Sequence, residues 1–287
     1  MLPATVNPAL PASDAANFTI NPDPAVAPRG RLFVMLPGTG AAPRNYRTVV
    51  RTGAARGYHG IGLTYVNGTA VAELCSVGST DLDCAGNARR EIITGENVST
   101  LVAVNPDGAV AGRLTALLDY LNRTFPADGW GQFLSGGAVN WSLVTVAGHS
   151  QGAGHAGYMA KLYSLDRSVM FSGPADVPAA GQTAARWLSL PNLTPLSRQY
   201  GFTHSDDEVV PYALARSNWS AIGLTGTPFL VDGAASPFGS GNLFYTAAPP
   251  TLAGASRHSS PVADVVTPTN AQGTPLYAPV WIYMAFP

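Results

Sequence analysis

The stretch that most constrains this chain is Gly148-His149-Ser150-Gln151-Gly152. A β-branched run over 144–146 precedes it, and small, helix-compatible residues follow it as far as position 160. The pattern predicts a strand, a sharp turn and a helix, with Ser150 at the turn. The residues two before and two after such a serine must lack a Cβ, because strand and helix approach closely there, and both are glycine.

Ser150 is a candidate nucleophile because of this context. The free N–H groups and the positive dipole end of the following helix would face an oxygen that develops negative charge beside the serine. A pattern with three fixed positions in five also arises by chance, and isolated matches are more often ordinary turns. The strand-like run before it and the helix-like run after it favour the catalytic interpretation.

Strand-like and helix-like runs also alternate before this motif. Residues 31–36 are almost unbroken in apolar character, which is typical of a parallel strand covered on both faces. We expect this strand to lie beside the one that leads to Ser150. A helix over 45–56 and a strand over 60–66 then complete a right-handed crossover unit. The expected fold class is therefore α/β, with a doubly wound, mostly parallel sheet.

The later part of the chain extends the same pattern. The 287 residues, 46% of them hydrophobic, are enough for one large core, so a single domain over 1–287 is expected. Residues 242–246 are a hairpin arm or an alternative to the last strand of the sheet. The other predicted elements are an amphipathic helix over 111–125, strands at 169–171, 198–204 and 227–232, and a closing apolar helix over 280–286.

Three segments lie outside this alternation. Residues 1–30 are expected to form an N-terminal arm or edge strands, and residues 67–107 and 173–195 to form long loops. Loops at the carboxyl ends of parallel strands rim the binding crevice of an open α/β sheet, so both are candidate walls of the cleft. Cys75 and Cys84 enclose a Gly/Ser/Asp-rich stretch in the first loop, where a disulfide is more natural than two free thiols.

Charge and composition limit the classes of partner. A net charge of −1 without a basic tract gives no reason to expect nucleic acid, and a neutral or weakly charged substrate is the default. No run of about 18 apolar residues predicts a transmembrane segment. The first residues show no leader pattern, so the chain is either cytosolic or a mature form. The expected disulfide favours a secreted or periplasmic protein.

A serine nucleophile needs an imidazole to accept its proton and a carboxylate to orient that imidazole. Of five histidines, His258 alone follows both the serine turn and a cluster of acids at the end of a strand. The cluster is Asp206, Asp207 and Glu208, and its alternative interpretation is a solvated helix cap. A metal site that includes His204 is weaker, because adjacent side chains of an extended segment point apart.

The Gly-His-Ser-Gln-Gly turn, the segment from Asp207 to Pro211 and the late His258 together resemble the α/β-hydrolase superfamily. The resemblance spans about residues 31–286. It implies a triad of Ser150, Asp207 and His258, with Asp206 as the fallback acid. It also implies an oxyanion hole made by the N–H groups of Gln151 and Thr39, and no cofactor.

The resemblance leaves three classes of function open. The first is a carboxylic-ester hydrolase, that is an esterase, lipase or polyesterase acting on a small or polymeric ester, and the turn is similar to those of cutinases and some lipases. Trp187, Phe244 and Tyr245 could bind acyl or aryl groups in such a cleft, or could be ordinary packing. The second is a peptidase or amidase. The third is a hydrolase fold kept as a binding protein.

Overall fold

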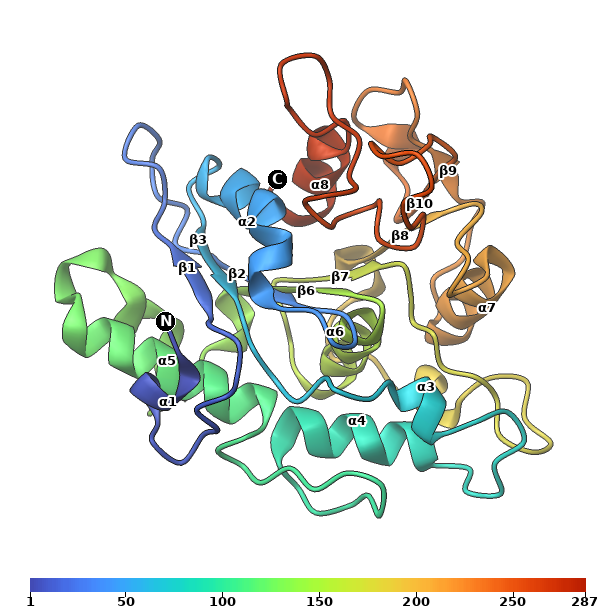
Figure 1. Cartoon of the computed structure of the whole chain (residues 1–287), viewed down its shortest axis with the longest axis horizontal. Coiled ribbons are helices and arrows are strands. Elements are labelled where there is room, and N and C mark those ends of the chain that lie inside the picture. The colour runs from blue at the N-terminus through green and yellow to red at the C-terminus, as the bar shows by residue number, and fades with distance from the viewer.

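An eight-stranded sheet, parallel except at one edge, forms the centre of the computed structural model, which describes residues 1–287 (Figure 1). The edge strand β1 pairs antiparallel with β3. In spatial order the strands are β1 (Phe18–Ile20), β3 (His59–Gly62), β2 (Leu32–Leu36), β6 (Val144–His149), β7 (Arg167–Phe171), β8 (Gln199–His204), β10 (Leu243–Thr246) and β9 (Phe229–Leu230). The expected α/β class and its mostly parallel sheet are confirmed.

The central strands are buried along their whole length. β2 and β6 lie side by side in parallel, with Leu36 opposite Gly148, as expected from their apolar runs. Successive residues of β2 enter different cores: Val34 packs into one apolar cluster and Phe33 into the other. A strand of this kind needs a cover on both sides, which explains the absence of polar alternation.

Helices cover both faces of the sheet. Figure 1 shows α2 and α8 on one side and α4 on the other, and the two apolar cores follow the same division. The helices are α1 (Pro3–Val6), α2 (Arg47–Ala54), α3 (Val71–Leu74), α4 (Cys84–Thr94), α5 (Val110–Thr124), α6 (Gln151–Leu162), α7 (Tyr212–Ile222) and α8 (Ala278–Ala285). A two-stranded hairpin of β4 (Leu134–Ser135) and β5 (Ala138–Val139) is separate from the sheet.

The segment 67–107 is not the long loop that was expected, because it contains α3 and α4. Ala85, Ala88 and Ile92 are buried at helical spacing along α4 and join the core that also covers α6. Arg89 and Glu91 interrupt this apolar side in the sequence, which hid the helix, although both are buried in the structure. A disulfide joins Cys75 to Cys84, with a Cα–Cα distance of 5.7 Å, as expected.

The end of the sheet also differs from the expectation. Residues 242–246, the possible hairpin arm, contribute β10, which runs parallel between β8 and β9. The 227–232 stretch contributes only the two-residue edge strand β9. No helix of the chain combines the length and apolar character required to cross a bilayer.

Candidate active site

Ser150 lies between β6 and α6 in a strained backbone conformation. Its φ of 56° and ψ of −115° are outside the regions that L residues favour. A Cβ at Gly148 would lie 2.0 Å from the carbonyl oxygen of Gly152, and a Cβ at Gly152 would lie 2.3 Å from that of Leu36. The close approach inferred from the two glycines is therefore confirmed. The Ser150 N–H donates to the Phe171 carbonyl, 2.9 Å away, which anchors the turn to β7.

Asp207 and His258 come together although they are 51 residues apart. His258 Nδ1 lies 2.9 and 2.8 Å from the two carboxylate oxygens of Asp207, and both residues are buried. Asp207 Oδ1 also accepts the N–H groups of Val209 and Val210 at 2.9 and 2.7 Å. These bonds fix the carboxylate and leave it facing the imidazole, as an orienting acid requires.

The neighbouring acids have different surroundings. Asp206 is exposed, and its N–H donates to Nδ1 of His204, 2.9 Å away. His204 Nε2 lies 3.1 Å from the carbonyl oxygen of Ala248, so both ring nitrogens of His204 already have partners. No group of three or more His, Cys, Asp or Glu side chains is arranged to hold a metal ion.

Glu208 holds the loop that carries His258. Its carboxylate accepts the hydroxyl of Ser256 and the N–H groups of Arg257 and His258, the latter two at distances of 3.1 to 3.4 Å. Partial burial raises the pKa of this carboxyl, but the hydrogen bonds outweigh burial and hold the pKa below its usual range. The sequence placed Glu208 in the acidic cluster without revealing this role, because its partners lie 48 to 50 residues later.

A second support for His258 comes from within the serine turn. Tyr46 Oη accepts the N–H of Gly38 at 3.1 Å and lies 2.9 Å from His149 Nδ1, while His149 Nε2 lies 3.0 Å from the carbonyl oxygen of His258. Burial first, and the nearby His258 second, lower the pKa of His149 to about 3, so its ring is neutral at ordinary pH. The Ser172 hydroxyl donates to the same carbonyl at 2.7 Å.

The two amides expected to form an oxyanion hole lie beside Ser150. Gly38 packs so closely that a Cβ on it would be 3.3 Å from that of Ser150, which brings the loop after β2 against the serine turn. Neither Thr39 N–H nor Gln151 N–H has an acceptor within the chain. The Thr39 hydroxyl donates to Gln151 Oε1 at 2.9 Å and so links the two residues.

These groups share one cleft of about 610 Å³. Ser150 Oγ and His258 Nε2 make no hydrogen bond within the chain, and neither is a buried atom without a partner, so both open onto the cleft. Its walls are mainly small aliphatic side chains, including Ala70, Val71 and Ala72 on one side and Val209, Val210 and Leu214 on the other.

Trp187 does not line this cleft, which corrects the expectation that it binds substrate. Its side chain is 2% exposed and lies between α4 and α6, where a Cβ at Gly86 or Gly157 would contact it at 3.2 or 3.4 Å. The two glycines make room for the indole in the core. Phe244 is likewise buried in the core, on β10, and is not part of the cleft wall.

Comparison with known proteins finds likeness in structure only. No family model matches the chain, and no curated protein matches it. Esterase 2 of Thermogutta terrifontis is 13% identical over 94% of this chain and 90% of its own, with a TM-score of 0.47. An α/β serine hydrolase homologue from Coxiella burnetii is 12% identical over 85% and 83%, with a TM-score of 0.42.

A further solved structure, an α/β serine hydrolase without a lid from Xanthomonas campestris, is 15% identical over 74% of this chain and 80% of its own, with a TM-score of 0.37. Each likeness is weak. The interpretation of the site therefore depends on the geometry of its own residues.

Proposed function

We propose that this protein is a serine hydrolase that cleaves carboxylic esters through an acyl-enzyme intermediate. The observation that carries the proposal is the pairing of His258 with both carboxylate oxygens of Asp207, in the same cleft as a strained Ser150. These three residues lie in the loops that follow β6, β8 and β10, and a solvated acidic cap would not enclose a distant imidazole.

In the first half of the reaction, Ser150 Oγ attacks the ester carbonyl carbon and His258 Nε2 accepts its proton. Asp207 accepts the Nδ1–H bond, which keeps Nε2 free to act as the base and stabilises the imidazolium. The carbonyl oxygen becomes an oxyanion that accepts hydrogen bonds from the N–H groups of Gln151 and Thr39. Collapse of this intermediate breaks the bond to the alkoxy oxygen, which takes the proton from His258 and leaves as an alcohol.

In the second half, water attacks the acyl-enzyme and gives a proton to His258. The new oxyanion accepts hydrogen bonds from the same two N–H groups. Collapse of this second tetrahedral intermediate releases the carboxylic acid, and the proton on His258 returns to Ser150 Oγ. No cofactor enters the proposal.

The cleft supports a neutral substrate with an aliphatic part. Its walls carry small aliphatic side chains, and its one exposed charged group outside the triad is Glu73. A carboxylate near this side chain would be repelled, whereas an alkyl chain buries apolar area at about 25 cal/mol per Å². A small ester or the end of a polymeric ester fits these walls.

The disulfide supports a location outside the reducing cytosol. Two buried cysteines nine positions apart are joined, and such bonds persist mainly in secreted and periplasmic proteins. We therefore propose that the protein acts in an oxidising compartment.

The test is hydrolysis of p-nitrophenyl esters with acyl chains of increasing length, measured for the wild-type protein and for Ser150→Ala. We expect turnover in the wild type, with a loss of at least about 10⁴-fold in the variant. Stoichiometric release of p-nitrophenol from a p-nitrophenyl phosphate triester would count the active serines. Unchanged ester turnover in Ser150→Ala would eliminate Ser150 as the nucleophile.

Matched p-nitroanilides separate the proposal from the amidase alternative, because the acyl group stays the same and only the leaving group changes. Ester turnover well above anilide turnover supports the proposal. Turnover of neither class in a folded wild-type protein would favour the binding-protein alternative.

A further inference from the structure

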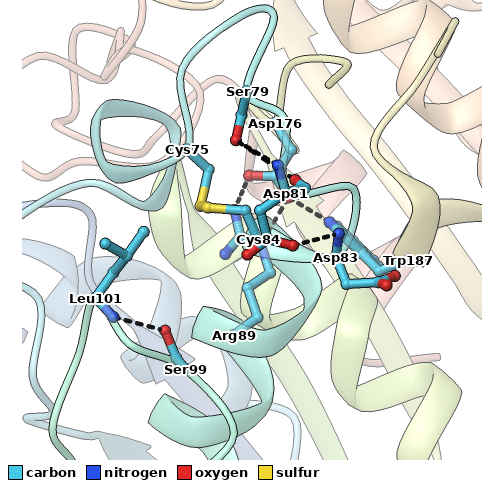
Figure 2. Close-up of a disulfide and its surroundings, with 10 residues drawn as sticks. All are labelled: Cys75, Ser79, Asp81, Asp83, Cys84, Arg89, Ser99, Leu101, Asp176 and Trp187. Carbon is cyan, nitrogen blue, oxygen red and sulfur yellow. Dashed lines mark hydrogen bonds and ion pairs between the residues drawn. A yellow bond between two sulfur atoms is a disulfide. The ribbon is translucent and has the colours of Figure 1, made fainter. Parts of the chain in front are cut away.

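A fully buried ion pair lies behind the helix that follows Ser150. Arg89 on α4 donates from Nε and Nη2 to the two carboxylate oxygens of Asp176, at 2.7 and 2.5 Å. The side chains are 1% and 0% exposed. Figure 2 shows the pair beside the Cys75–Cys84 disulfide, with the indole of Trp187 on the other side of the carboxylate.

The third arm of the guanidinium reaches the serine turn. Arg89 Nη1 donates to the main-chain carbonyl of Gln151 at 3.1 Å. The guanidinium lies on the first turn of α6, where a Cβ at Gly154 would be 2.2 Å from its Cζ. Only a glycine at this position lets a side chain from α4 lie against the α6 backbone.

Asp176 is itself fixed by residues from other parts of the chain. Its Oδ2 accepts the indole N–H of Trp187 at 2.5 Å. Nδ2 of Asn218, on α7, donates to the main-chain carbonyls of Pro174 and Asp176, both at 2.9 Å. The segment after β7, α7 and α4 therefore meet at one residue, because α7 holds the main chain of Asp176 while its carboxylate holds the arginine against α6.

We propose that Arg89 and Asp176 are positioning residues that fix the first turn of α6, and with it the Gln151 N–H that receives the oxyanion. This inference rests on the proposed function. Arg89 borders the cleft, but its bonds go to Asp176, to the Gln151 carbonyl and, from Nη1, to His155 Nδ1 at 3.4 Å, so it acts through α6 rather than on the substrate. The planar fork is needed, because lysine could pair with Asp176 but could not also hold the Gln151 carbonyl.

Arg113 on α5 offers a matched control. It also pairs with an aspartate, Asp14, at 2.6 Å, and also donates to a main-chain carbonyl, that of Gly108, at 2.7 Å. Arg113 is buried like Arg89, but it does not border the cleft. Arg89→Lys and Arg113→Lys therefore make the same chemical change, and only the first affects α6.

The first measurement is steady-state ester hydrolysis well below the melting temperature of each variant. For Arg89→Lys we expect kcat to fall by about 10- to 100-fold with KM within about threefold. The displaced Gln151 N–H interacts with the charge that develops in the transition state and contributes little to binding of the neutral ester. Affinity for a trifluoromethyl ketone, whose serine adduct carries an oxyanion, should fall in parallel. Arg113→Lys should keep kcat within about twofold of wild type.

The second measurement is hydrogen–deuterium exchange, which does not depend on activity. Amides of residues 153–156 should exchange faster in Arg89→Lys than in wild type, with no such change in Arg113→Lys. Arg89→Met/Asp176→Asn, which removes both charges together, should show the same local increase and the same loss of kcat, because position 89 then has no donor for the Gln151 carbonyl.

The outcomes separate the two proposals. Wild-type kcat and wild-type exchange in Arg89→Lys would overturn the positioning role, and so would an exchange increase spread evenly over the chain together with a lower melting temperature. Faster exchange confined to 153–156 supports the positioning role even if the wild-type protein hydrolyses no ester, and that result would reject the proposed function alone.

Discussion

The two sides of the cleft are held in different ways. The side that carries His258 is held by loop hydrogen bonds to Glu208, an exposed carboxylate, and by His149 and Ser172. The side that carries the Gln151 amide is held by Arg89 and Asp176, which are almost completely buried. A base changes its charge during the reaction, whereas an oxyanion hole gains from donors that do not move.

The acid of the His258 side gives the largest expected effect. Asp207→Asn should lower kcat by about 10⁴-fold, because an amide no longer selects the tautomer that leaves Nε2 free. Asp206→Asn is the matched control one residue away, on a side chain that does not face His258. Ester kinetics of both variants would test the comparison. Similar losses in the two would show that Asp207 is not the orienting acid.

The opposite side is tested through Thr39. Thr39→Pro removes the backbone N–H and should lower kcat by about 10²- to 10³-fold, as expected for one oxyanion donor. Thr39→Val keeps that N–H and removes only the hydroxyl bonded to Gln151 Oε1, so its loss should be much smaller. Equal losses would mean that the hydroxyl, and not the amide, matters.

Each side of the cleft contains a buried histidine whose protonation should lower the stability of the fold. Burial lowers the pKa of His149, near the base, to about 3, and burial together with the Arg89 charge lowers that of His155, on α6, well below 6.5. The unfolded chain therefore binds protons that the folded chain does not, so stability falls as the pH drops below about 6.5.

Each neutral histidine lowers the free energy of unfolding by up to about 1.4 kcal/mol for each pH unit below its unfolded pKa. The two together lower the folding equilibrium constant by up to about 100-fold per pH unit. Urea unfolding at several pH values between 7 and 5 measures the slope. His155→Gln should reduce the slope by the equivalent of about one proton and leave the contribution of His149 unchanged. A free energy of unfolding that stays constant over this range would contradict the prediction.

The smallest effect is expected at Glu208. Glu208→Gln keeps the size of the side chain but weakens the bonds to the N–H groups of Arg257 and His258, so kcat should fall by about three- to tenfold. The pKa of Glu208 is lowered in the folded protein, so its stabilising contribution is present above about pH 4.5 and is lost as the pH falls through the folded value. Activity of the variant at pH 7, and unfolding of the wild type and the variant at pH 7 and at about pH 3, would measure both effects.

Local patterns were sufficient to predict much of the fold. The apolar runs of β2 and β6 predicted neighbouring parallel strands, and the glycines around Ser150 predicted the strand–turn–helix approach. Helix α4 was missed because Arg89 and Glu91 lie on its buried side, where the sequence pattern reads as polar. Asp176, the partner of Arg89, is 87 residues away, too distant for any local pattern to include, and the partners of Glu91 are main-chain amides of residues 98–104, which leave no mark in the sequence.

The same limit applies to the candidate site. The order of serine, acid and histidine along the chain pointed to Ser150 and His258, which line one cleft, and to an acid that contacts His258. Choosing Asp207 over Asp206 depended on a superfamily resemblance. Trp187 was assigned to the cleft from its place in a loop, but an indole with glycines on two helices beside it packs into the core. Tyr46 and Glu208 had no local signal at all, since their roles exist only through contacts formed on folding.

The glycine at 154 has a consequence for anyone who would alter this protein. Replacing a helical glycine by alanine usually strengthens a helix by about 1 kcal/mol, which makes Gly154→Ala an obvious choice for a more heat-resistant variant. Here the added methyl group would occupy the space of the Arg89 guanidinium. Positions 89, 154 and 176 can therefore change only as a group, and homologues that lack the arginine should be free to carry alanine there.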